Sequence, residues 1–577
     1  MATELAKPRR KRRGRWIALT VIVLIGMAVV RSRDAEPSIK PGSYLVVPIE
    51  GAYTEAQPKD PVTRLFDERN VLVDLLETLR KARHDDRIAG VVARIGPLDS
   101  GWAQAREIRD ALASVRASGK KVIAFLSSDV ITGNREYYLG SIADELIVPP
   151  AASSMLNGLS AQYFFLGAFW EKLHVAMEVE QIREFKTFGD MLTRRSMSPA
   201  HREMANSILD NINDEFLATI ADARGLSVEE TQEIVNSCPS SAEDFLEAGL
   251  ADRVLFFDQI ESHIDETGQV DLVEASTYAA VSAQSLGLGG GPRVAVIHAA
   301  GTIVPGEGGR GATGNSVGSA PLVEALEKAS EDDSIRAIVM RIDSPGGSAS
   351  ASDVVWRAIR KAGEKKPVIA SLGDVAASGG YYMAAGSDHI VAEPATLTGS
   401  IGVVLFKPNL AGLLGWMGIG TDGLSRGRYA RIMDTTKGLD RAESALLRTQ
   451  MNGVYKRFLD RVAVGRGMTT EEVDVIGGGR VWTGLQALER GLVDELGGLE
   501  QAVRAAAVEA RVEQPESVEL VYLPEPQGLL EQLTNLQSGV FAAGLPQPLV
   551  AAVDALAPVA GLRPGIHTFS DALPSIR

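Results

Sequence analysis

The sequence EDDSIRAIVMRI at residues 331–342 closely matches HDDRIAGVVARI at residues 84–95, which lies 247 positions earlier. Two further pairs follow in the same order, at offsets of 244 and 242: Tyr137-Tyr138 with Tyr381-Tyr382, and Gly249–Asp252 with Gly491–Asp494. A slowly drifting offset is typical of a duplicated unit that has gained and lost a few residues. The sequence therefore predicts two copies of one domain.

The alternation of element types within each copy indicates the fold class. Short runs rich in β-branched residues, at 293–297, 337–342 and 368–371, alternate with helical patterns at 351–362 and 442–462. This order is typical of an α/β architecture with a largely parallel sheet. The expected organisation is a basic segment at 1–15, a membrane anchor at 16–30, a first domain at 40–285, a Gly-rich linker at 286–292, a second domain at 293–525 and a tail at 526–577 without an assigned role.

Length and charge limit the possible functions. The 577 residues exceed the roughly 250–300 at which one hydrophobic core stops growing, so at least two domains are expected. The formal net charge is −15, although residues 1–33 hold nine Lys and Arg against one acid, Glu4. Such an acidic body repels nucleic acid, because phosphate binding needs clustered positive charge. The single cysteine, Cys238, and the absence of a Cys/His cluster in the sequence predict neither a disulfide nor a metal cofactor.

The N-terminus has the pattern of a membrane-targeting segment. Six basic residues between Arg9 and Arg15 precede the apolar run Trp16–Val30. These 15 residues are fewer than the ~20 of a comfortable bilayer span, and they also fit the apolar part of a cleavable signal peptide. The residues that follow lack a small-x-small cleavage site, which favours an uncleaved single-pass anchor. Because positive residues stay cytoplasmic, the body is expected on the periplasmic side of a bacterial inner membrane.

The stretch Ser371–Gly386, SLGDVAASGGYYMAAG, carries the first candidate for chemistry. It begins as an apolar strand, passes through small residues and continues into a helix-compatible run, with Ser378 at the junction. A serine there would lie at a helix N-terminus, where free N–H groups stabilise negative charge. The alternative is an ordinary N-cap, which is a common role for serine at this position.

A glycine-rich loop could complete such a site. The loop Asp343–Ser348, DSPGGS, follows a predicted strand, and the amides of Gly346 and Gly347 could face the same point as the amide of Gly379. Two backbone N–H groups that converge on one oxygen form an oxyanion hole. The alternative for these glycines is a plain turn.

Three segments together resemble one protein family. They are Ser-Pro-Gly-Gly at 344–347, Ala-Ala-Ser-Gly-Gly-Tyr-Tyr at 376–382 and Leu-Thr-Gly-Ser-Ile-Gly at 397–402. They are similar to the catalytic half of the long, tandem-domain form of signal peptide peptidase A (protease IV). The resemblance extends over roughly residues 40–525, with the N-terminal anchor in addition.

The resemblance implies a Clp/crotonase-like fold and a Ser/Lys dyad divided between the two copies. The family's lysine segment is similar to Arg183–Phe188, which makes Lys186 the matched base for the nucleophile Ser378. Ser400 matches a family serine that hydrogen-bonds the lysine amine. The implied enzyme is a membrane-anchored serine endopeptidase that degrades released signal peptides, works without a cofactor and forms a homo-oligomer, a tetramer in the family.

The internal repeat supports the divided dyad independently. At an offset of 244, Lys186 aligns with Ala430 and Ser378 aligns with Asn134, so each copy keeps one member and lacks the other. A lysine acts as a base only when it is neutral, so its pKa must fall below the ordinary value of about 10.4.

Three alternatives remain from the residues alone. A Ser–His pair would use His389, but eleven helical residues would place it about 16 Å from Ser378. A crotonase-like acyl-CoA enzyme would share the fold without needing an anchor or a divided dyad. A non-catalytic membrane scaffold would lose no turnover when Ser378 is replaced.

Overall fold

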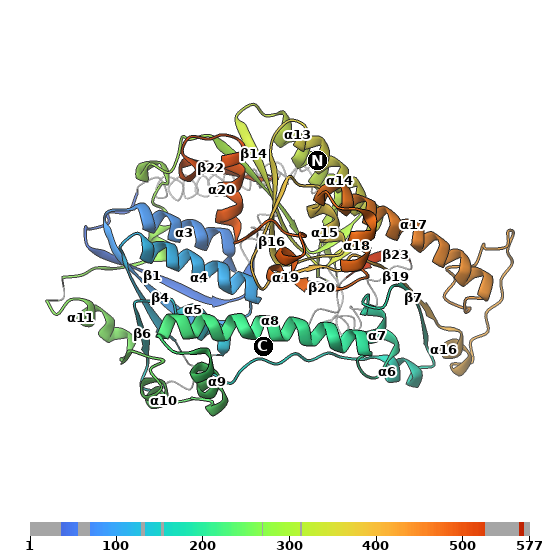
Figure 1. The fold of residues 1–577 in the computed structure, drawn as a ribbon, viewed down its shortest axis with the longest axis horizontal. Coiled ribbons are helices and arrows are strands. Elements are labelled where there is room, and N and C mark those ends of the chain that lie inside the picture. The colour runs from blue at the N-terminus through green and yellow to red at the C-terminus, as the bar shows by residue number, and fades with distance from the viewer. Residues whose placement is uncertain are drawn as a thin grey trace, which may run out of the picture.

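The computed structural model describes residues 36–55, 70–127, 133–151, 155–267, 269–311, 314–524 and 565–569. Within these ranges the chain forms two largely parallel sheets, a third sheet that joins them and a short two-stranded sheet (Figure 1). The predicted basic segment and anchor, and the tail apart from 565–569, lie outside the described residues. Among the helices in the described part of the chain, none is long and apolar enough to cross a membrane.

The first sheet is parallel throughout and belongs to the first copy. Its order is β8-β6-β5-β4-β1-β9. Its strands are β1 (Ser43–Gly51), β4 (Ile88–Leu98), β5 (Lys121–Leu126), β6 (Glu145–Val148), β8 (Arg253–Val254) and β9 (Leu272–Glu274). Central strands β4 and β5 are buried nearly throughout because helices cover the sheet.

The second sheet repeats this order with additions. Strands β21, β17, β16, β14, β10 and β22 pair in parallel, and β18 joins β16 while β20 adds an antiparallel edge. These strands are β10 (Arg293–Ala300), β14 (Ile335–Ser344), β16 (Val368–Ala377), β17 (His389–Ala392), β18 (Leu397–Gly399), β20 (Val481–Thr483), β21 (Glu495–Leu496) and β22 (Glu519–Leu523). The predicted α/β class and the tandem repeat are confirmed.

Equivalent hydrogen bonds show that the two copies fold alike in detail. The hydroxyl of Tyr137 donates to the carbonyl of Leu250 at 2.9 Å, and the hydroxyl of Tyr381 donates to that of Leu492 at 2.7 Å. Asp144 and Asp388 correspond at the same offset of 244, and their carboxylates accept the amides of Val122 on β5 and Val368 on β16, at 2.9 Å each. The pairs that were aligned in sequence therefore occupy equivalent places.

Helices cover both sheets and follow the repeat. In the first copy they are α3 (Leu72–His84), α4 (Trp102–Ala117), α5 (Asn134–Gly140), α6 (Gly167–Lys172), α7 (Phe188–Thr193), α8 (Pro199–Arg224), α9 (Val228–Ser237), α10 (Ala242–Glu247), α11 (Ile260–Ile264) and α12 (Ala275–Tyr278). In the second they are α13 (Ser319–Glu331), α14 (Ala349–Gly363), α15 (Gly379–Ala384), α16 (Ala411–Trp416), α17 (Arg441–Arg466), α18 (Thr470–Ile476), α19 (Gly484–Glu489) and α20 (Leu499–Glu509). Helices α8 and α17 are both 26 residues long, and each ends at a glycine in the left-handed conformation.

The third sheet mixes segments that are far apart in the sequence. Its order is β12-β13-β11-β15-β23-β19-β7. Its strands are β7 (Ala176–Ile182), β11 (Thr302–Val304), β12 (Gly308–Gly311), β13 (Gly314–Gly318), β15 (Gly346–Ser348), β19 (Val403–Asn409) and β23 (Gly565–Phe569), while β2 (Tyr53–Thr54) pairs separately with β3 (Asn70–Val71). Strand β7 of the first copy pairs antiparallel with β19 of the second, so the first copy contributes a strand to the other half.

A buried ionic cluster also joins the two copies. The guanidinium of Arg341, on β14, contacts the carboxylate of Glu55 at 2.7 Å and that of Glu107, on α4, at 2.6 Å. The side chain of Arg341 is 0% exposed, and those of its partners are 3% and 5% exposed. A carboxylate of the second copy, Asp374, accepts the amides of Gly101 and Gln104 at the start of α4 at 3.0 and 2.9 Å. These contacts fix the two halves relative to each other.

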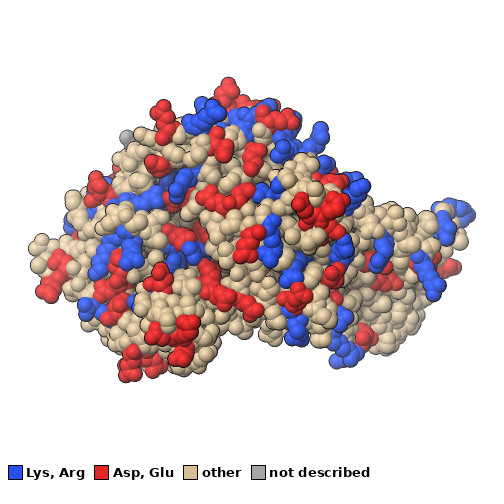
Figure 2. Space-filling view, in the orientation of Figure 1, with Lys and Arg blue, Asp and Glu red and all other residues tan. Residues whose placement is uncertain are grey.

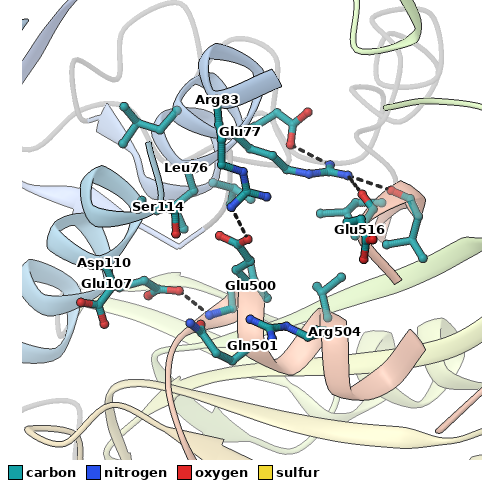
Figure 3. A pocket seen from close by; sticks show the side chains of 18 of the residues that line it. Leu76, Glu77, Arg83, Glu107, Asp110, Ser114, Glu500, Gln501, Arg504 and Glu516 are labelled. Atoms are coloured by element: carbon teal, nitrogen blue, oxygen red, sulfur yellow. Dashed lines mark hydrogen bonds and ion pairs between the residues drawn. The ribbon is translucent and has the colours of Figure 1, made fainter. Parts of the chain in front are cut away.

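A pocket lies at the same junction, between α3, α4 and α20 (Figure 3). Arg83 and Glu500 face each other across it at 2.8 Å, and the carboxylate of Glu107 accepts the amide of Leu499 at 2.5 Å. Ser378 and Lys186 are not among the residues that line it. On the face shown in Figure 2, basic and acidic side chains are interspersed, without a large patch of one sign.

Candidate active site

The nucleophile candidate Ser378 lies where β16 turns into α15, as the sequence predicted. Its backbone has φ 55° and ψ −112°, which is the strained left-handed side of conformational space for a non-glycine residue. Its amide donates to the carbonyl of Gly399 at 2.8 Å. The side chain makes no capping hydrogen bond to α15, so the alternative of an ordinary N-cap is wrong.

Strand pairing brings Lys186 to this serine. Strand β7 ends at Ile182 opposite Val403 of β19, so the residues after β7 run alongside the residues just before β19. Lys186 lies in this short connection before α7. The ladder therefore places Lys186 beside Ser400, although the two are 214 residues apart in the sequence.

The three predicted side chains meet in one hydrogen-bonded cluster. The amine of Lys186 lies 2.7 Å from the Ser378 hydroxyl oxygen and 2.9 Å from the Ser400 hydroxyl oxygen, and it donates to the Ser400 carbonyl at 3.0 Å. Their exposed fractions are 1%, 0% and 2%, respectively. Burial disfavours the charged form of a lysine, and the partners in these three contacts are uncharged. The arrangement suits a neutral amine within reach of a hydroxyl proton.

A loop of three glycines, Gly477–Gly479, which the sequence analysis did not identify, hydrogen-bonds the backbone next to Lys186 and next to Ser400. The carbonyl of Gly478 accepts the amide of Phe185 at 3.2 Å, and the amide of Gly479 donates to the carbonyl of Ile401 at 2.8 Å. A Cβ on Gly479, which has φ +86°, would lie 2.4 Å from the backbone nitrogen of Lys186. The sequence signal for this loop was the run Gly477–Gly479 after a helical pattern, because a site where two backbone segments approach closely requires glycine.

The close approach of Gly479 to the backbone of Lys186 predicts that one added methyl group at residue 479 lowers the rate of catalysis. We expect Gly479→Ala to lower kcat by about tenfold to a hundredfold with little change in KM, since a displacement of the base by about 1 Å has effects of this size. Steady-state kinetics on the purified variant would measure it. Gly453→Ala is the matched control, because a Cβ on that helical glycine meets nothing within 4 Å. Unchanged kcat in Gly479→Ala would contradict the positioning role.

The predicted oxyanion glycines lie in β15 and at the start of α15. Gly346 has φ 111° and Gly347 has φ 151°, backbone conformations that favour glycine. The amide of Gly346 donates to the hydroxyl of Ser344 at 3.2 Å, so in this structure it has an internal acceptor. Gly379 is the first residue of α15 and follows Ser378 directly.

Two half-buried carboxyl groups lie in the strands next to Ser378, Asp343 on β14 and Asp374 on β16. Burial, assisted by the nearby Glu55, raises the pKa of Asp343 to about 8. Burial also raises the pKa of Asp374 to about 6, against the lowering effect of the two amides of α4. The side chain of Asp343 accepts the amide of Val375 at 3.0 Å. The raised pKa favours the protonated, uncharged form of Asp343.

The other sequence candidates lie elsewhere. His389 begins β17 rather than continuing a helix, so the premise of eleven helical residues is wrong, and its ring contacts Glu495 at 3.2 Å. Asn134, the equivalent of Ser378, hydrogen-bonds the carbonyl of Gly158 at 2.8 Å. Ala430, the equivalent of Lys186, lies in an exposed loop. Cys238 ends α9 as a free thiol.

Comparisons with known proteins identify the family of this chain. The model of Peptidase family S49 matches residues 114–271 and again residues 360–513, once in each copy. "Serine protease SPPA, chloroplastic" from Arabidopsis thaliana is 36% identical over 91% of this chain and 77% of its own length. "Protease 4" from Salmonella typhi is 31% identical over 85% of this chain and 79% of its own length. "Protease 4" from Haemophilus influenzae is 27% identical over 75% and 72%, respectively. With the family matched in both copies and a relative of this identity along most of its length, the chain belongs to peptidase family S49 and is a serine peptidase.

Proposed function

We propose that Ser378 is the nucleophile of this peptidase and that Lys186 is its general base. The observation that carries the proposal is the 2.7 Å separation between the Lys186 amine and the Ser378 hydroxyl, with both side chains buried. A base within hydrogen-bond reach of the proton it removes meets the first requirement of general base catalysis. Ser400, at 2.9 Å from the same amine, orients the base as the third member of a triad does.

The reaction then proceeds by acyl transfer. The neutral amine of Lys186 takes the hydroxyl proton of Ser378 while the oxygen attacks the carbonyl carbon of the peptide bond. Backbone amides of Gly346, Gly347 or Gly379 stabilise the oxyanion, and the Lys186 ammonium returns its proton to the leaving amine. Water, deprotonated by the same lysine, then hydrolyses the acyl-enzyme.

The proposed substrates are extended, apolar peptides, including signal peptides released from secretory proteins. Support comes from the resemblance to signal peptide peptidase A and from the small residues around the nucleophile, Ala376, Ala377, Gly379 and Gly380. We also propose that each copy has a Clp/crotonase-like fold. The family assignment favours it over acyl-CoA chemistry and over a scaffold without activity.

We place the enzyme at a bacterial inner membrane, held by residues 16–30 with its body on the periplasmic side. The support is the basic cluster before this run and the resemblance of roughly residues 40–525, with the N-terminal segment in addition, to the anchored family. Homo-oligomer formation is part of the proposal. An arm formed by α16 and residues 417–424 extends beyond β7 and β19 (Figure 1). It exposes Trp416 at 67% and Leu424 at 93%, and exposed apolar clusters of this kind are typical of contacts between proteins.

Active-site labelling combined with substrate profiling tests the proposed function. We expect a serine-directed phosphonate to modify Ser378 alone, and a peptide library to be cleaved after small or apolar residues. Peptide mass mapping and product sequencing give both readouts. Ser378→Ala should lose the label, whereas Ser350→Ala, at an exposed serine in the first turn of α14, should keep it. Labelling of another residue, or a dominant requirement for Lys or Asp at the cleaved position, would overturn the proposal.

A further inference from the structure

Two side chains on the adjacent helices α17 and α18, Tyr455 and Asp474, hold the loop Gly477–Gly479 (Figure 1). The hydroxyl of Tyr455 donates to the carboxylate of Asp474 at 2.5 Å and accepts the amide of Gly478 at 3.3 Å. Tyr455 is 6% exposed, and burial raises the pKa of its phenol against the lowering effect of the Gly478 amide. The hydroxyl therefore keeps the proton that it donates, and it fixes the loop from below through one backbone amide.

The same carboxylate binds the chain just before Lys186. The guanidinium of Arg183 donates to Asp474. Arg183 follows β7 directly and has φ 71°, in the left-handed region that non-glycine residues rarely adopt, so surrounding contacts must hold it there. Two residues later, the amide of Phe185 donates to the carbonyl of Gly478 at 3.2 Å. These contacts close a ring that ends at the residue before Lys186.

The duplicated positions in the first copy lack the groups that hold this loop. Helices α8 and α17 have the same length and begin 242 residues apart (441 − 199). At this offset Tyr455 aligns with Asn213 and Asp474 aligns with Gln232, while the three glycines align with the sequence Val-Asn-Ser at 235–237. At these equivalent positions, the hydroxyl, the carboxylate and the glycines therefore occur only in the copy whose loop contacts the lysine segment.

We propose that Tyr455 and Asp474 are positioning residues for the general base Lys186, and that they act through the loop Gly477–Gly479. The proposal rests on the function proposed above. The Lys186 amine must stay within hydrogen-bond reach of the Ser378 hydroxyl, and a displacement of about 1 Å at a reacting group lowers rates strongly. The hydroxyl of Tyr455 contacts Asp474 and the loop rather than the reacting atoms, so its effect reaches the lysine through the backbone.

Removal of a single hydroxyl tests the proposal. We expect Tyr455→Phe to lower kcat by about three- to thirtyfold with KM unchanged, because the base moves while the peptide site does not. The rise of kcat with pH should also shift to higher pH, since water admitted around the Lys186 amine favours its charged form. Steady-state kinetics across a pH series would measure both effects.

The first copy provides a matched control for this substitution. The hydroxyl of Tyr138, which is 1% exposed, also donates to a carboxylate, that of Glu215, at 2.7 Å. Tyr138→Phe makes the same chemical change in a buried tyrosine–carboxylate hydrogen bond that does not reach the lysine segment. It should leave kcat, KM and the pH profile as in the parent.

The partner carboxylate gives a second variant. Asp474→Asn keeps an oxygen that accepts the Tyr455 hydroxyl but removes the charge that binds Arg183, so we expect kcat to fall and KM to stay unchanged. The double variant Tyr455→Phe/Asp474→Asn should be no worse than the more impaired single variant, because residues in one hydrogen-bonded network are coupled. If Tyr455→Phe does not fold, Asp474→Asn carries the test. Losses in kcat that multiply in the double variant would contradict a shared role.

Amide hydrogen exchange separates this inference from the proposed chemistry. In the full-length protein without substrate, peptides covering residues 183–188 and 477–480 should exchange faster in Tyr455→Phe than in the parent, and at the parent's rate in Tyr138→Phe. If Lys186→Ala kept the parent's activity, the proposed function would fail, while exchange would still show whether Tyr455 holds this segment. An unchanged kcat and pH profile in both Tyr455→Phe and Asp474→Asn would overturn the inference, whatever the exchange rates.

Discussion

Alanine at Ser378 or at Lys186 is expected to remove nearly all turnover, by about 10⁴-fold or more in kcat, and the double variant is expected to be no worse than either single one. Catalytic groups that act as a unit have non-additive effects, and the 2.7 Å contact makes these two side chains such a unit. Steady-state kinetics on purified protein would measure the three variants side by side. If the loss of kcat in the double variant were the product of the losses in the two single variants, the two residues would not act as a dyad.

Graded substitutions make this test more specific. Lys186→Arg should fail as completely as Lys186→Ala, because a guanidinium stays protonated and cannot accept the serine proton. Ser400→Ala should cost less, about 10- to 100-fold, since it removes one orienting hydrogen bond and leaves the nucleophile and base in place. A folded Lys186→Ala protein with the parent's kcat/KM would show that another group is the base.

The pH profile provides an independent readout of the same dyad. Activity should rise with pH as the buried ammonium of Lys186 loses its proton, because only the neutral amine accepts a proton from Ser378. Burial also raises the pKa of Asp343 to about 8. The ionisation of Asp343 would therefore also produce a change in activity with pH, near pH 8. In Asp343→Asn the rising limb should persist if it belongs to the lysine. Its disappearance would assign the limb to the aspartate.

Removal of the charge at Arg341 is expected to destabilise the fold strongly, because its guanidinium is fully buried between two carboxylates. Arg341→Met would leave the buried carboxylates of Glu55 and Glu107 without their cation, and breaking a buried ion pair costs about 3–5 kcal/mol. The free energy of unfolding from urea titrations would measure this loss. Because the cluster joins the two copies, we also expect the unfolding transition of the Arg341→Met protein to separate into two steps, one for each copy.

The duplication supplies a control for this prediction. Arg94 is the equivalent of Arg341 in the first copy, but it is exposed and lies 5.1 Å from the ring of Phe257. Arg94→Met should cost only about 0.5–1 kcal/mol, as is typical of an exposed cation–π contact. Neutralising the partners together, in Arg341→Met/Glu55→Gln/Glu107→Gln, should recover part of the loss. Equal effects of Arg341→Met and Arg94→Met would show that the buried cluster contributes little.

The amino-acid sequence was sufficient for features that depend on neighbouring residues. The repeat, the runs that became β10, β14 and β16, and the strand-to-helix junction at Ser378 all follow from local patterns of apolar and small residues. The loss of one dyad member from each copy was also visible, because equivalent positions could be compared directly. The hydrogen bonds of Tyr137 and Tyr381 then confirm that the aligned residues are equivalent in space.

Only the tertiary structure decided how distant segments meet. The sequence carried no signal that β7 would pair with β19, and this pairing places Lys186 next to Ser378, 192 residues away. It also carried no signal that the C-terminal segment would form β23 beside β15, or that Arg341 would pair with two acids of the other copy. The physical reason is that an edge strand offers backbone donors and acceptors to any extended segment, and a buried charge accepts any partner of opposite sign. Which segment arrives is set by the path of the whole chain, and no local pattern of residues records that path.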